Sequence, residues 1–136
     1  MSNPNVLQVL VANGAILHTL LNASGTWQGF FGNVNGVNGN SDLQFSQVGG
    51  TGVGGTLHVC GVASDGGLYH TYRSANGGWQ GFLGDVNSEN TGASVPAFTD
   101  VGCAGVQSNG LVHVCAVGTD GILYHTYRNA DGSWQG

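Results

Sequence analysis

The hexapeptide LYHTYR occurs twice in this chain, at Leu68–Arg73 and again at Leu123–Arg128, 55 residues later. A weaker copy, ILHTLL, stands at Ile16–Leu21, which places His18 52 residues before His70. The tripeptide WQG keeps the same two steps, since it begins at Trp27, Trp79 and Trp134. Self-similarity at a period of about 50 residues indicates a repeat architecture, and the chain contains three copies of the repeat.

The last copy shows how each repeat is built. We expect strands over 98–106, 111–117 and 122–128, followed by a fourth strand that begins at Trp134. Between them stand turn dipeptides that supply the positive φ values of tight hairpins: Asn109-Gly110, Asp120-Gly121 and Asp131-Gly132. All three connections therefore predict antiparallel pairing. A four-stranded meander repeated in this way is typical of a β-propeller blade.

We therefore expect an all-β fold, a single β-propeller arc over residues 1–136 made of four-stranded antiparallel blades. The copies span approximately 1–36 (partial), 42–87 and 97–136 (outer strand truncated), which makes about two and three-quarter blades. The first copy opens at its second strand, over 6–12. A β-trefoil is less suitable, because its shorter repeats would have to fit whole within the chain. Terminal blades without neighbours expose apolar faces, so either identical chains complete the ring or the chain is a fragment of a longer propeller.

Composition agrees with a folded, turn-rich β protein. Apolar residues make up 40% of the chain and there are 26 glycines but no lysine, which argues against disorder and against a collagen-like repeat. Arg73 and Arg128 are the only strong cations and the formal net charge is −5, so nucleic acid and anionic membranes are poor partners. With no apolar run long enough for membrane insertion and no Sec signal, we expect a soluble protein, cytoplasmic or released by a non-classical route.

The cysteines and carboxylates do not indicate a cofactor or a metal. The three cysteines are odd in number and contain no CxxC pair, while Cys60 and Cys115 occupy equivalent repeat positions, which favours packing. Neither a phosphate-binding loop, a nucleophile elbow nor a pair of carboxylates outside turns is present, so we expect no enzyme activity. His58 and His113 are interpreted as structural.

Candidate ligand-binding residues are the polar and aromatic side chains that recur in the repeat. They are His18, Trp27, His70, Tyr72, Arg73, Trp79, His125, Tyr127, Arg128 and Trp134. Each histidine either pins one blade to the next through hydrogen bonds or contacts a ligand. Each arginine either pairs with a local aspartate or binds a polyol or carboxylate. Each tryptophan is either a core wedge between blades or a platform for the apolar face of a sugar ring.

Three units of the repeat also carry a family resemblance. The segments Asp65–Arg73, Ala75–Phe82 and Phe82–Val86 resemble the bacterial PLL-type propeller lectins and the similar tectonin and tachylectin groups. The resemblance implies a sugar-binding propeller with sites around the ring that recognise fucose or O-methylated sugars. This chain departs from the pattern at Tyr69 and Tyr124, where Trp is frequent, and in the first copy, which has Leu17, Leu20 and Leu21 in place of Tyr, Tyr and Arg.

Two functional hypotheses follow. The first is a multivalent lectin without catalysis that binds glycans or monosaccharides, with fucose-like, O-methylated or N-acetylated sugars at repeated sites on or between blades. On this hypothesis the best sites involve the second and third copies, through His70, Arg73 and Trp79 and through His125, Arg128 and Trp134. The alternative is a structural or protein-interaction propeller whose repeats preserve packing without sugar binding.

Overall fold

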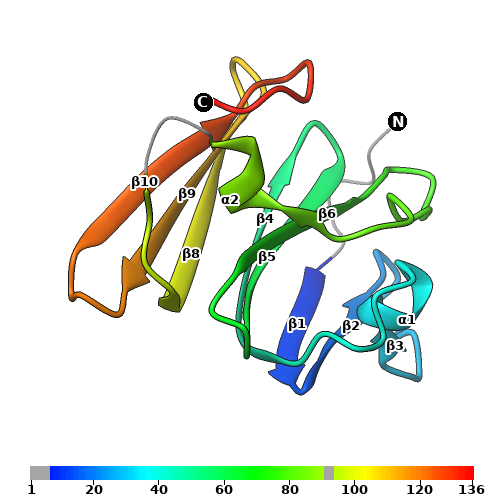
Figure 1. Cartoon of the computed structure of the whole chain (residues 1–136). Coiled ribbons are helices and arrows are strands. Elements are labelled where there is room, and N and C mark those ends of the chain that lie inside the picture. The colour runs from blue at the N-terminus through cyan, green and yellow to red at the C-terminus, as the bar shows by residue number, and fades with distance from the viewer. Residues whose placement is uncertain (1–6, 91–93) are drawn as a thin grey trace.

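The computed structural model describes residues 7–90 and 94–136, and there the chain forms three antiparallel sheets that follow one another in sequence order (Figure 1). Blade 1 consists of β1 (Leu7–Asn13), β2 (Ala15–Leu21) and β3 (Gly32–Asn33). Blade 2 consists of β4 (Phe45–Val53), β5 (Thr56–Ala63), β6 (Leu68–Arg73) and β7 (Gly84–Asp85). Blade 3 consists of β8 (Phe98–Val106), β9 (Leu111–Gly118) and β10 (Leu123–Arg128). The expected all-β, blade-like architecture is confirmed.

The described part of the chain adds two helices of one turn each, α1 (Val34–Val37) and α2 (Val86–Glu89). Each follows the short last strand of its blade, β3 or β7, and begins at a polar cap: Asn33 accepts a hydrogen bond from the Gly36 N–H, and Asp85 from the Asn87 N–H. No helix in these residues is long and apolar enough to cross a bilayer. Val6, where the first strand was expected to begin, lies outside the described residues.

The expectation that the tryptophans open the fourth strand is wrong. Trp79 meets Arg73 in an isolated bridge, and the fourth strand lies farther on, where Gly84 and Asp85 pair with β6. The reason is Gly81, whose φ of 95° turns the chain away from β6 immediately after the tryptophan. The other two WQG glycines, Gly29 and Gly136, have φ values of 88° and 90°. WQG is therefore a bend that leads toward the fourth strand.

Two apolar cores lie between consecutive blades. The core between blades 1 and 2 is formed by Ile16, Val34, Phe45, Leu57, Val59, Ala63 and Leu83. The core between blades 2 and 3 is formed by Val53, Cys60, Val62, Leu68, Val86, Phe98, Val112, Val114 and Ala116. Successive side chains of β5 enter different cores, since Val59 packs toward blade 1 and Cys60 toward blade 3. A side chain of blade 2 therefore faces either blade 1 or blade 3, according to whether its position in the strand is odd or even.

The strands nearest the centre of the arc, β4 and β8, approach each other closely because glycines face the contact. A Cβ placed on Gly49 would lie 3.4 Å from the Gly102 Cα, and one on Gly105 would lie 3.0 Å from the Gly52 carbonyl oxygen and clash with Val53. The Gly105 N–H also donates to Thr51 Oγ1 at 2.8 Å. Small residues at these positions let the blades converge here and leave space toward the periphery.

Asparagines at the ends of the two helices, Asn38 buried and Asn90 half-buried, fasten each blade to the next. Asn38 of α1 accepts hydrogen bonds from Thr71 Oγ1 at 3.1 Å and from the Gly81 N–H at 2.9 Å, both in blade 2. Asn90 of α2 accepts one from Thr126 Oγ1 of blade 3 at 2.5 Å. These bonds fix the peripheral half of each blade against its neighbour, next to the recurring histidines and tryptophans.

Candidate functional site between blades

The recurring histidine and tryptophan meet across blade boundaries. His70 of blade 2 contacts Trp134 of blade 3 edge to face, with ring centroids 5.4 Å apart and planes at 84°. His18 of blade 1 and Trp79 of blade 2 repeat the contact at 5.4 Å and 83°. Edge-to-face packing of this kind stabilises aromatic pairs beyond simple area burial. We call each such pair a His–Trp joint.

Each joint unites residues of two consecutive copies, whereas the sites were expected within one copy. In LYHTYR the histidine is the third residue and the arginine the sixth, so a strand of period two sends them to opposite faces. His70 accordingly lies with Arg128 and Trp134, and Arg73 lies with Trp79 toward His18. The grouping of His70 with Arg73 and Trp79 is not observed.

A cleft opens at the joint between blades 2 and 3. Its volume is about 140 Å³, small beside the roughly 300–1,000 Å³ of pockets for drug-sized molecules. Blade 2 and α2 contribute one wall and blade 3 the other, and the lining residues are His70, Gln80, Phe82, Gly84, Glu89, Arg128, Gly132 and Trp134. We call this the second cleft. Aromatic, cationic and amide groups converge there on a space that suits one small polar molecule.

The repeat places an equivalent set of residues between blades 1 and 2, and we call that position the first cleft by analogy with the second. The same repeat positions are occupied there by His18, Gln28, Phe30, Gly32, Arg73, Gly77 and Trp79. In both clefts the arginine lies over a turn glycine: a Cβ on Gly77 would be 3.0 Å from Arg73 Nη2, and one on Gly132 equally 3.0 Å from Arg128 Nη2. The matching geometry shows that the two clefts are built on one plan.

His70, which lines the second cleft, is held by a second, stacked histidine, His58. His58 Nδ1 and His70 Nε2 are 3.1 Å apart, and the rings are 5.3 Å apart at 22°. Burial lowers the pKa of His58 to about 4, with a smaller effect of Arg128. Burial, then His58 and Arg128, lowers the pKa of His70 to about 3. Both rings are therefore neutral at pH 7, so the N–H of one ring donates a hydrogen bond to the unprotonated nitrogen of the other.

Blade 1 replaces the histidine partner by an amide. Gln8 Oε1 lies 2.5 Å from His18 Nε2, at the strand position that His58 occupies in blade 2. Burial, followed by the nearby Arg73 charge, lowers the pKa of His18 to about 4. Sequence reasoning interpreted His58 and His113 as structural and did not foresee that they hold the site histidines. The available signal was a histidine at the same repeat position, two residues before Cys60 and Cys115.

Arg128 reaches from blade 3 onto blade 2. Its guanidinium carbon lies 5.6 Å from the ring centre of Tyr72, a cation–π contact across the blade boundary. Arg128 also lines the second cleft. Tyr72 thus supports the arginine, and the arginine is placed both to brace the blades and to contact a ligand.

Gln80 supplies the most direct indication of a ligand. Its side-chain oxygen Oε1 is buried, has no hydrogen-bond partner among the described residues, and belongs to a residue that lines the second cleft. Buried acceptors are nearly always satisfied in folded proteins, because leaving one unpaired costs about 1–3 kcal/mol. A hydroxyl or N–H of a bound molecule would complete it. The glutamine recurs as Gln28, Gln80 and Gln135, and this repetition is the signal in the sequence that points to the position.

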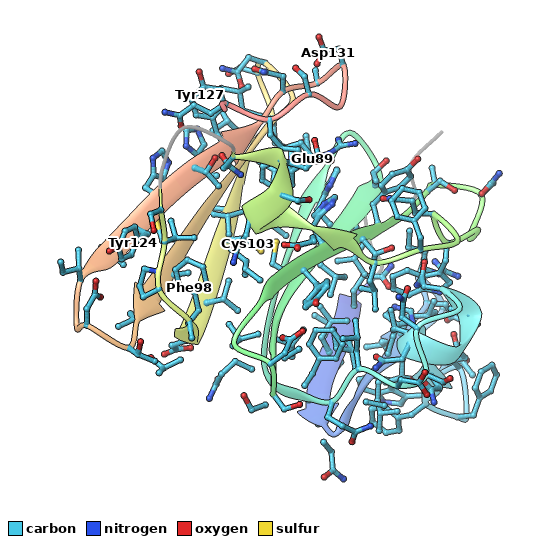
Figure 2. All side chains as sticks on the ribbon, viewed as in Figure 1. Glu89, Phe98, Cys103, Tyr124, Tyr127 and Asp131 are labelled. Carbon is cyan, nitrogen blue, oxygen red and sulfur yellow. The ribbon has the colours of Figure 1, made fainter. Side chains whose placement is uncertain are left out.

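The remaining predicted residues lie on the two outer faces of the arc. His125 pairs with His113 at 2.9 Å but is exposed, and Tyr127 packs on both rings. Figure 2 shows Tyr127 and Asp131 at the end of blade 3 nearest the C-terminus. Trp27 is 51% exposed on the opposite outer face, that of blade 1. Each outer face thus carries one residue of a His–Trp joint, His125 or Trp27, without the partner from a neighbouring blade.

A larger cavity of about 190 Å³ also lies between blades 2 and 3, toward Phe98 and Tyr124 (Figure 2). Its walls are mainly apolar side chains of the core, including Leu68, Val86 and Val114, with His125 and Thr126 at the edge. We favour the second cleft as the functional site, although it is smaller, because it combines a cation, an unpaired acceptor and a tryptophan.

The three sheets and their interblade clefts define the fold of the bacterial propeller lectins. Over 99% of this chain, the structure is similar to the BP39L lectin from Burkholderia pseudomallei, with a TM-score of 0.67 and 20% identity; the match spans 37% of that lectin's length. A fucose lectin from Kordia zhangzhouensis, solved with methyl-fucoside, matches 95% of this chain and 87% of its own, with a TM-score of 0.55 and 17% identity. No family model and no curated protein matches the sequence. The resemblance suggested by the repeat motifs is thus confirmed for the fold.

Proposed function

We propose that this protein is a non-catalytic, multivalent carbohydrate-binding protein whose sites are the clefts between blades. The observation that carries the proposal is the unpaired Gln80 Oε1 beside Arg128 and Trp134 in a cavity of about 140 Å³. A sugar offers hydroxyl donors to the amide oxygen, hydroxyl acceptors to the guanidinium and a C–H face to the indole. The lectin structures of the same fold support this proposal.

The lining of the clefts favours a single sugar unit with an apolar substituent. Phe30 and Phe82, at equivalent positions in the two clefts, are 64% and 54% exposed, an unusual position for so large an apolar side chain. The methyl group of a 6-deoxy sugar, an O-methyl group or an N-acetyl group would cover such a ring. We therefore propose fucose-like, O-methylated or N-acetylated sugars as ligands, each bound weakly and made effective by several sites on clustered glycans.

Titration of the protein with methyl-fucoside tests this function. Arg128→Met keeps most of the aliphatic stem and removes the donors, and a hydrogen bond from a charged group contributes about 1.5–3 kcal/mol. The affinity of the second cleft should fall tenfold or more, while circular dichroism shows an intact fold. Absence of binding to the wild-type protein and to a broad glycan array would remove the proposal.

The alternative is a structural or protein-interaction propeller, and the His–Trp joints and the Arg128–Tyr72 contact give it a specific basis. On this alternative, Trp79→Ala and Trp134→Ala lower the free energy of unfolding. Added sugar does not change the melting temperature of the wild-type protein. On the lectin proposal, sugar raises the wild-type melting temperature, and the same variants lose that increase as well as stability.

We further propose that copies of the chain associate end to end. The outer face of blade 3 presents His125, and the outer face of blade 1 presents Trp27, the two partners that meet in each internal joint. Leu123 and Leu7, which are 67% and 54% exposed, lie on these faces as well. Because the two faces differ, the contact is heterologous and repeats until a ring closes.

Light scattering tests this association. We expect the wild-type protein to have a mass of at least two chains, each of 13.8 kDa. Trp27→Arg should lower the mass to that of one chain. Trp79→Arg is unsuitable as a comparison because that side chain is internal. Phe30→Arg is the control and should leave the mass unchanged, because Phe30 is an exposed aromatic residue of blade 1 at the first cleft, on the side that faces blade 2. A wild-type monomer at all accessible concentrations would contradict the proposal.

A further inference from the structure

The two clefts share their histidine, glutamine, phenylalanine, glycine and tryptophan but differ at two charged positions. Glu89 lines the second cleft, and the equivalent residue of the first repeat, 52 positions earlier, is Val37. Asp131 precedes the turn glycine beneath Arg128, and the equivalent residue beneath Arg73 is Asn76. Neither difference alters the backbone: α1 and α2 each span four residues, and both turn side chains accept a hydrogen bond from the N–H two residues on.

These differences give the clefts opposite charge. Arg128 and Glu89 line the second cleft, and Asp131 stands beside it, in the turn directly before the lining residue Gly132, so one positive group is accompanied by two negative ones. The pKa of Asp131 is lowered first by hydrogen bonds from Ser133 and also by Arg128, so this carboxylate is ionised and close enough to the guanidinium to interact with it. The first cleft holds Arg73 with Val37 and Asn76, one positive group and no carboxylate at these positions.

The two other carboxylates next to β6, Asp85 and Asp65, are engaged away from Arg73. Asp85 pairs with Tyr69 near the opposite end of β6 from Arg73, and its side chain caps α2. Asp65 is engaged by the Tyr69 hydroxyl at 2.7 Å and by the Gly67 N–H at 2.8 Å. The Arg73 charge is instead felt by His18, whose pKa it helps to lower, and a protonated histidine is therefore not available to add a second positive charge.

We propose that charge divides the two sites: the first cleft accepts a sugar that carries an anionic substituent, such as a sulfate ester or a carboxylate, whereas the second cleft accepts neutral sugars and repels anionic ones. This inference rests on the proposed function and adds to it the class of ligand at each site. An uncompensated guanidinium at an interblade position binds anionic oxygens through short, charge-assisted hydrogen bonds. Glu89 in the second cleft and Asp131 beside it oppose an incoming anion within the screening length of about 8 Å at physiological salt.

The experiment compares methyl-fucoside with its sulfate ester and follows the indole N–H resonances of Trp79 and Trp134, assigned with Trp79→Phe and Trp134→Phe. We expect the sulfate ester to bind at Trp79 at least tenfold more tightly than at Trp134, with an affinity that falls as salt is raised. Inorganic sulfate at the same concentration serves as the control for the anion alone and should bind far more weakly than the sulfated sugar.

The two clefts supply matched variants for each other. The residues that differ are exposed, so each pair can be replaced by the pair that the other cleft carries. Val37→Glu with Asn76→Asp should lower the preference of the first cleft for the sulfate ester over the neutral sugar about tenfold, and Glu89→Val with Asp131→Asn should raise that preference in the second cleft by a similar factor. Equal binding of the ester to both clefts, preferences that the exchanges do not change, equal binding of inorganic sulfate, or no response at Trp79 would overturn the inference.

The two proposals fail in distinguishable ways. If the neutral fucoside binds neither cleft while the sulfate ester binds at Trp79, the fucose-like specificity is wrong and the charge division stands. If the neutral fucoside binds both clefts and the ester is excluded from both, the proposed function stands and the charge division is wrong.

Discussion

Buried histidine acts in this molecule as a neutral hydrogen-bonding group. His58 and His70 bond to each other, and His18 bonds to Gln8, in environments that lower all three histidine pKa values to about 3–4. In the unfolded chain the same side chains titrate near 6.5. The unfolded state therefore binds more protons than the folded state below pH 6.5, and the joints depend on the uncharged form.

The first prediction concerns pH. Because the folded-state pKa values are lowered, the stabilisation is complete above about pH 6.5 and is lost progressively as the pH falls toward 4. We expect the melting temperature to decrease from pH 7 to pH 4.5, as measured by circular dichroism. His58→Gln, which copies the amide of blade 1, should fold and make this decrease less steep. A melting temperature that rises on acidification would contradict the assignment.

Strand parity shows what could and could not be predicted for single residues. Period-two alternation sends His70 and Arg73 to opposite faces of the blade. A single sequence does not reveal which neighbouring blade each face meets, so it does not group the residues of two consecutive copies that meet at a joint. The role of Gln80 depends on the absence of a partner for one buried oxygen. Such a property belongs to the three-dimensional arrangement and has no counterpart in local sequence.

The elements of the blades follow from local chemistry where turns decide them. Asn-Gly and Asp-Gly dipeptides fixed the hairpins, and β8 has the predicted bounds, Phe98–Val106. The fourth strand was misplaced because the positive φ of Gly81 cannot be distinguished in sequence from the ordinary flexibility of glycine. Helices of one turn are equally invisible, since four residues are too few for a helical hydrophobic period.

The second prediction tests the helix-end asparagines. Asn38→Ala removes the acceptor of Thr71 Oγ1 and of the Gly81 N–H and leaves two buried or half-buried donors unpaired. At about 1–3 kcal/mol for each, the free energy of unfolding should fall by about 3 kcal/mol in denaturant titrations. Asn90→Ala removes a single such interblade bond, from Thr126, and should cost about half as much. Equal losses would show that α1 and α2 contribute alike.

The third prediction tests the close approach of β4 and β8. Gly105→Ala places a Cβ against Val53 and 3.0 Å from the Gly52 carbonyl oxygen, and we expect it to lower the free energy of unfolding by about 1–3 kcal/mol. Gly52→Ala is the matched control: it occupies the equivalent position of blade 2 and would meet nothing within 4 Å. Thermal unfolding of both variants measures the difference, and a Gly105→Ala protein as stable as its control would refute the steric argument.

At the level of the whole chain, the rate at which the buried Cys60 thiol is alkylated reports on the contact between blades 2 and 3. Cys60 is fully buried, and both its contact with Cys103 and its burial raise its pKa. Figure 2 shows Cys103 on the side of blade 3 that faces blade 2. Alkylation of Cys60 therefore requires the two blades to separate or the chain to unfold.

The fourth prediction links this thiol to the ligand. A sugar bound in the second cleft contacts both blades, so at 100 times its dissociation constant it should stabilise the docked state by about 2.7 kcal/mol. We expect alkylation of Cys60 by iodoacetamide, measured by mass spectrometry, to slow up to 100-fold when separation of the blades is the rate-determining event. Cys115, on the outer face of blade 3, is the internal reference and should be modified at the same rate with and without sugar. An unchanged Cys60 rate at saturating sugar would place the ligand elsewhere.

Because every His–Trp joint is built from two consecutive repeats, a change in the number of repeats in the gene also changes the set of binding sites. Each cleft draws one wall from one repeat and the other wall from the next, so no repeat encodes a complete site. Unequal recombination that adds or removes one whole repeat then changes the number of clefts by one and preserves every inherited wall, while its junction creates a new pairing of walls. Duplication of unaltered DNA can thereby produce a specificity that neither parent possessed, before any point mutation occurs.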